Sequence, residues 1–96
     1  MTPPSKILAR VLKYPKEKRG DLIAIYIETR DQTDHVVCYS VARGDFSVEK
    51  RQQMMWKTRR AEPHEQARIL SALRDIGETV IIKTNAHPSY GDREEQ

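Results

Sequence analysis

The 96-residue chain is expected to form one domain, and its 38% of hydrophobic residues can supply a core, which excludes disorder throughout. Its single cysteine, Cys38, excludes an internal disulfide and a cysteine-based zinc cluster, and favours a reducing, cytoplasmic location. The net charge is +3, and residues 1–60 hold 13 Lys and Arg against 7 Asp and Glu, whereas residues 61–96 hold 4 against 7. This asymmetry predicts a positive face that attracts phosphates or an acidic protein.

The amino-terminal residues, MTPPSK, contain two prolines where a secretory signal needs a continuous apolar stretch. The longest apolar run, residues 22–27, has only six residues, so the sequence indicates neither export nor a membrane span. We expect a flexible N-terminus over residues 1–4, one domain over residues 5–85, and a flexible C-terminal tail over residues 86–96.

Three strands are expected in the first half of the chain. Residues 6–14 are rich in aliphatic side chains and are followed by a turn at 15–21. Residues 22–28 are apolar on both faces, as a central strand is, and residues 35–42 alternate with period two after another polar turn. Residues 42–45 read ARGD, which we interpret as a tight turn rather than an integrin-type motif, since the chain shows no export signal. Together these segments predict an antiparallel meander.

The segment 46–60 fits two structures. Its Lys, Arg, Gln and Met residues are good helix formers. Alternation instead places Phe46, Val48, Met54 and Trp56 on one face and most of the cations on the other. We favour a fourth strand, in which Met54 and Trp56 turn inward and the cations point to solvent.

An amphipathic helix is predicted over residues 62–77. Pro63 suits the first helical turn, Glu62 and Glu65 suit its positive end, and Gly77 suits the carboxyl cap. Residues 78–84 then form a short apolar strand that returns to the sheet edge or pairs beside the first strand. The expected fold is α+β, of order β-β-β-β-α-β, with a mostly antiparallel sheet of four to five strands and one amphipathic helix on one face. The other face is then left to solvent or a partner.

The sequence shows little evidence of a catalytic site or a metal site. His35, His64 and His87 lack metal-ligand spacing, and Cys38 lies on the opposite strand face from His35, so it is interpreted as a core residue. The carboxylate pairs fall in turns or at a helix end, so they are interpreted as solvated charges and not as catalytic acids and bases. The four glycines are isolated from one another, so the sequence predicts no phosphate-binding loop. We expect no enzyme activity, no metal and no cofactor.

Two functions remain. The first is a small nucleic-acid-binding module that engages DNA or RNA backbone electrostatically and with little sequence preference. Its candidate contacts are Lys16, Lys18, Arg19, Arg51, Lys57, Arg59 and Arg60. The alternative is a small protein-interaction or regulatory domain, a homodimer or the binder of an acidic protein, that uses an open sheet face or an edge strand.

Overall fold

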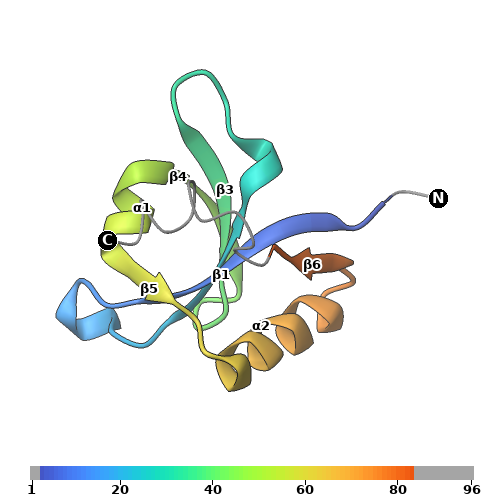
Figure 1. The fold of residues 1–96 in the computed structure, drawn as a ribbon. Helices are drawn as coiled ribbons and strands as arrows, with labels where there is room; N and C mark the ends of the chain where they lie inside the picture. Colours follow the sequence, from blue (N-terminus) through green and yellow to red (C-terminus); the bar gives the residue numbers. More distant parts are fainter. Residues whose placement is uncertain (1–2, 84–96) are drawn as a thin grey trace.

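The computed structural model describes residues 3–83, which form a six-stranded, mostly antiparallel sheet with two α-helices and two short 3-10 helices (Figure 1). The elements in chain order are β1 (Ser5–Leu12), η1 (Lys16–Lys18), β2 (Leu22–Tyr26), η2 (Ile27–Thr29), β3 (His35–Ser40), β4 (Asp45–Lys50), α1 (Arg51–Lys57), β5 (Thr58–Arg60), α2 (Pro63–Asp75) and β6 (Val80–Ile82). The predicted α+β class is confirmed. Half of the flexible terminus predicted at residues 1–4 and the whole predicted tail, residues 86–96, cannot be compared, because residues 1–2 and 84–96 lie outside the described part.

The sheet has the strand order β4-β3-β2-β1-β5, so the predicted meander is confirmed. The long strand β1 pairs with β2 along one edge, and shares its other edge between β6, at Ser5–Ile7, and β5, at Arg10–Leu12. Strand β6 runs parallel to β1, which confirms that the last strand pairs beside the first. The turn between β3 and β4 contains Gly44 at φ +69°, a backbone conformation that glycine adopts without strain.

Both faces of the central strands are covered, and each face has its own core cluster. On one face, alternate residues of β1 and β2 such as Ile7 and Ala24 pack with Ile69 and Leu73 of α2. On the opposite face, Ile23, Ile25, Val36 and Cys38 pack with Met54 and Met55 of α1. The expectation of a single helix and an open second face is therefore wrong, because α1 covers that face.

Helix α2 confirms the strongest local signals in the sequence. Its first residue is Pro63, and a capping box joins Glu62 and Glu65, each of whose side chains accepts a hydrogen bond from the other's backbone N–H. Gly77 follows the helix at φ +85°, as the carboxyl-terminal cap requires.

The predicted strand over residues 46–60 is wrong at its centre, where seven residues form α1. Met54 and Met55 are consecutive and both buried, which a strand cannot achieve against one core but a helix face can. The start of α1 is held by Asp34, whose backbone carbonyl accepts from Arg51 N at 2.7 Å. Long-range contacts thus override the alternation that the sequence shows.

Arg10 of β1 holds the carboxyl end of α1. Its side chain is only 2% exposed, and it donates to the carbonyls of Met55 and Thr58 at 3.3 and 2.9 Å and to Thr58 Oγ1 at 3.0 Å. A cation at the carboxyl end of a helix also opposes the negative end of the helix dipole. This contact fixes the direction in which α1 leads into β5.

Neither α1 nor α2, the two α-helices among residues 3–83, has the length and apolar character that a bilayer-spanning helix needs.

Candidate nucleic-acid interface

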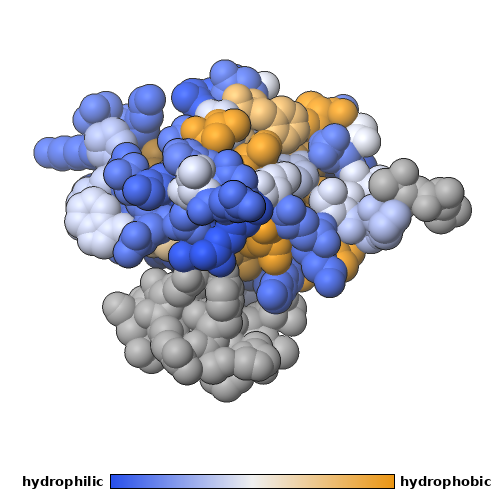
Figure 2. Space-filling model, turned by 90° about the horizontal axis from the view of Figure 1, so that it is seen from above, coloured by the Kyte–Doolittle hydropathy of each residue, from blue (hydrophilic) through white to orange (hydrophobic). Residues whose placement is uncertain are grey.

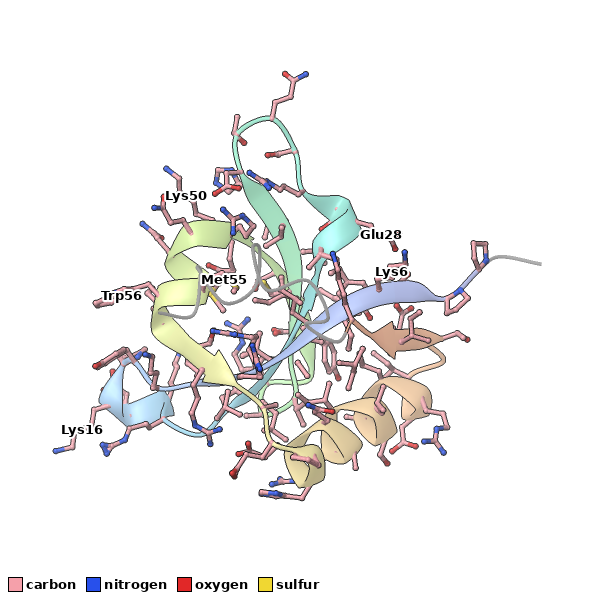
Figure 3. The ribbon with its side chains drawn as sticks, in the orientation of Figure 1. Lys6, Lys16, Glu28, Lys50, Met55 and Trp56 are labelled. Carbon is pink, nitrogen blue, oxygen red and sulfur yellow. The ribbon has the colours of Figure 1, made fainter. Side chains whose placement is uncertain are left out.

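Two exposed aromatic side chains, Tyr14 and Trp56, stack on each other and form the most distinctive surface feature; we call them the aromatic platform. Their ring centroids are 5.3 Å apart and the ring planes meet at 17°. Trp56 remains 68% exposed and Tyr14 49% exposed. In Figure 3 the Trp56 side chain projects away from the ribbon on the left of the view. The prediction that Trp56 turns inward is therefore wrong.

The backbone explains how the platform is positioned. Since Met54 and Met55 face the core, the advance of about 100° per residue in a helix turns the next side chain, Trp56, toward solvent. Lys13 N and Tyr14 N both donate to the carbonyl of Lys57, at 2.8 and 3.3 Å. The chain just after β1 is thus tied to the last residue of α1, which brings the two rings together.

Five lysines lie around the platform, and we call them the lysine rim: Lys13, Lys16, Lys18, Lys50 and Lys57. Lys13 Nζ is 5.8 Å from the centre of the Tyr14 ring, and Lys50 borders the same shallow hollow as Trp56. Lys18 and Lys57 line a second cavity together with Tyr14. Lys16, Lys50 and Trp56 project from one side in Figure 3, and that side is mostly hydrophilic in Figure 2.

None of the rim ammonium groups lies within ion-pair distance of a carboxylate of residues 3–83. Their positive charge is therefore left for an external anion, as far as the described residues are concerned. Such a set of cations around exposed rings is the arrangement that a phosphate backbone with unstacked bases requires.

The seven cationic residues predicted as contacts lie in different elements of the fold. Lys16 and Lys18 belong to η1 and Arg19 follows it, while Lys57 ends α1. Arg19 and Arg59 line one shallow hollow with Lys13, whereas Arg51 lies at the opposite end of α1 from the platform. Arg60 is exposed in β5, where its Cα pairs with that of Arg10.

Arg51 and Arg59 are engaged by carboxylates of the described residues. Arg51 Nε lies 2.9 Å from Asp34 Oδ1, and this hydrogen bond lowers the pKa of the Asp34 carboxyl. Arg59 donates to both oxygens of Glu65, at 3.0 and 2.8 Å, which lowers the pKa of Glu65 to about 2 and raises that of Arg59. These arginines are paired within the protein, so their charge is less available to an external anion than the charge of the lysine rim.

The sequence reasoning missed Tyr14, Lys13 and Lys50. Tyr14 was placed at the end of a strand, and its approach to α1 depends on the Lys57 carbonyl, more than 40 positions along the chain. The available signal was the adjacency of Met54 and Met55, because only a helix buries both and thereby turns Trp56 outward.

A cavity of about 190 Å³ lies beside the platform, smaller than the roughly 300–1,000 Å³ of most drug-sized ligand sites. Its lining combines buried apolar residues, among them Leu12, Ile23 and Met54, with the charged residues Lys18, Lys57, Arg43, Asp21 and Glu49. Cys38 forms part of the wall, but burial raises the pKa of its thiol to about 12, which keeps it protonated and weakly nucleophilic. The confirmed burial of Cys38 supports its interpretation as a core residue.

Glu62, His64 and Glu65 lie together at the start of α2, with ligand atoms within 4.8 Å of one another. The two glutamates form the capping box, and both Glu65 oxygens also accept from Arg59. Helix capping accounts for this proximity.

No protein-family model matches the chain, and comparisons with curated proteins and with solved structures find no similar protein.

Proposed function

We propose that the protein is a single-strand-selective nucleic-acid-binding module, in which an unstacked base packs on the aromatic platform and the lysine rim engages the flanking phosphates. The observation that carries the proposal is the exposure of Trp56, 68%, in a stack with Tyr14. The predicted contacts Lys16, Lys18 and Lys57 are retained, while Arg51 and Arg59 become structural residues.

Stacking supplies the preference for single strands. A base on an aromatic side chain contributes about 1–3 kcal/mol and every base offers such a face, so the module tolerates different sequences. Bases in a duplex are already stacked and paired, and releasing one costs a few kcal/mol. A duplex consequently uses only the lysines.

Charge supplies the remaining affinity. For a single strand, the logarithm of the association constant falls with the logarithm of salt concentration by about 0.7 per neutralised phosphate. If three or four rim lysines each contact one phosphate, the expected slope is about −2 to −3.

The test is a fluorescence-anisotropy titration of labelled single-stranded DNA, single-stranded RNA and duplex DNA of equal length, at low and moderate salt. Trp56→Ala should weaken single-strand binding about five- to hundredfold, while Trp56→Phe, which keeps a stacking ring, should retain most of the affinity. Duplex binding should change little in either variant.

A charge-matched pair of double variants tests the lysine rim. Lys13→Gln with Lys57→Gln should weaken binding to both single-stranded and duplex nucleic acid. It should also make the slope of log association constant against log salt concentration shallower by about 1 to 2. Arg68→Gln with Arg74→Gln removes two exposed cations from α2 and should leave affinity nearly unchanged. Equal losses in the two double variants, or no binding at low salt, would refute the proposal and leave an acidic protein as the better candidate partner.

A further inference from the structure

The outer edge of β4 is a second surface of interest, and within the described part of the chain it has no strand beside it. Among residues 3–83, β4 pairs with β3 alone and ends the sheet. Helix α2 packs on β1, β2 and β6, so the face above β4 is not covered by it. There Phe46 stays 46% exposed and Val48 66% exposed, although the Phe46 ring contacts those of Tyr39 and Tyr26 at 4.8 and 5.8 Å. An edge strand with exposed apolar side chains is a template for pairing with another strand.

The register of β4 against β3 shows which backbone groups are free. Arg51 N donates to the carbonyl of Asp34, and hydrogen-bonded pairs recur at every second position of an antiparallel ladder. The pairs that exchange backbone hydrogen bonds are therefore Val36 with Glu49, Cys38 with Ser47, and Ser40 with Asp45. The N–H and C=O groups of Phe46, Val48 and Lys50 consequently point away from β3, toward the outer edge. Their side chains share one face of the sheet.

We infer that the protein forms a symmetric homodimer in which two β4 strands pair antiparallel about a two-fold axis at Val48. A two-fold axis perpendicular to the sheet leaves each face of the sheet on the same side. Since opposed residues on antiparallel strands have side chains on the same face, the axis must place one residue opposite its own copy and not opposite its neighbour. At Val48 the apolar side chains meet each other and each Phe46 lies opposite the aliphatic stem of Lys50 in the second copy. The six outward backbone groups of each strand are then paired.

Charge selects this register over its neighbours. An axis at Ser47 would set Asp45 opposite Glu49 of the second copy, twice, and an axis at Glu49 would set the two Glu49 carboxylates against each other. With the axis at Val48, Glu49 faces Ser47 and Asp45 faces Arg51, so no like charges are opposed.

This inference does not rest on the proposed function, and its test contains no nucleic acid. Single cysteines are introduced at neighbouring positions, Val48→Cys and Ser47→Cys. The variants are oxidised mildly and separated without reductant on a denaturing gel, which dissociates any dimer that is not cross-linked. The Val48→Cys variant should form a covalent dimer of twice the 11.2 kDa chain, because opposed residues on paired strands lie about 5.5 Å apart at Cα, within disulfide reach. Ser47→Cys and the natural chain, whose Cys38 is buried, should remain monomers on the same gel.

A second variant measures the association without cross-linking. Val48→Lys places two like charges at the axis, on a strand edge where the substitution does not disturb the core, and should weaken the dimer at least about tenfold in sedimentation equilibrium. Preferential cross-linking of Ser47→Cys would overturn the register. A natural chain that stays monomeric at high concentration, with neither cysteine variant cross-linked, would overturn the dimer itself.

Discussion

The buried side chain of Arg10 is expected to determine whether α1 forms. Arg10→Met retains the aliphatic stem but removes the guanidinium, which leaves the carbonyls of Met55 and Thr58 without their donor in the interior. Each unsatisfied buried polar group costs about 1–3 kcal/mol, and Thr58 Oγ1 loses least because it still donates to Met54 O. We therefore expect the free energy of unfolding to fall by about 3–5 kcal/mol, a large part of the roughly 5–15 kcal/mol of a typical domain.

The assay is urea denaturation followed by circular dichroism and by the emission of Trp56, the sole tryptophan. The control is Arg59→Met in β5, which removes an arginine that is 47% exposed and paired with Glu65 on the surface; its loss should not exceed about 1 kcal/mol. If Arg10→Met cost less than about 1 kcal/mol, or no more than the control, the buried hydrogen bonds would not be what holds α1 in place.

Two further predictions concern titrating groups. Because burial raises the thiol pKa of Cys38 to about 12, a disulfide reagent at mildly alkaline pH should label the native protein far more slowly than the urea-unfolded chain, and fast labelling of the native state would contradict the burial. Arg59 lowers the pKa of Glu65 from its ordinary 4.5 to about 2, so this pair contributes stability above pH 4.5 that is lost as the pH falls toward 2. After screening by solvent the loss should be no more than about 1 kcal/mol, measured as a shift in the urea midpoint, and Glu65→Gln should abolish that part of the pH dependence.

The regular parts of the fold could be predicted from the sequence because their signals are local. Strands β1 and β2 are aliphatic-rich segments and β3 alternates with period two, each between polar turns, and α2 begins at Pro63 and ends before Gly77. Each of these signals acts within a few residues, so a single sequence reveals it.

Helix α1 could not be predicted in the same way. A seven-residue helix is too short to be stable from its own propensity, and its ends are held by Asp34 and Arg10, which are 17 and 45 positions from the groups they bind. The alternation from Phe46 to Trp56 continued past the true end of β4 by coincidence.

The residues predicted for the candidate interface were affected by the incorrect strand prediction for residues 46–60. A strand over residues 46–60 would put Trp56 in the core and the arginines on the surface. Helix α1 instead puts Trp56 on the surface. Which cations remain available also depends on partners that composition does not reveal, such as Glu65 for Arg59 across the connection from β5 to α2.

The central claim, that Trp56 and Tyr14 form a platform for a base, is tested most directly by the indole N–H resonance of Trp56 in a proton–nitrogen correlation spectrum. Without ligand, proton contacts between the two rings should be observed, as their 5.3 Å centroid separation requires. Addition of a short oligothymidine should shift the indole resonance upfield, to saturation, as a base stacks on it. An indole resonance that stays in place while resonances of α2 move would contradict the account.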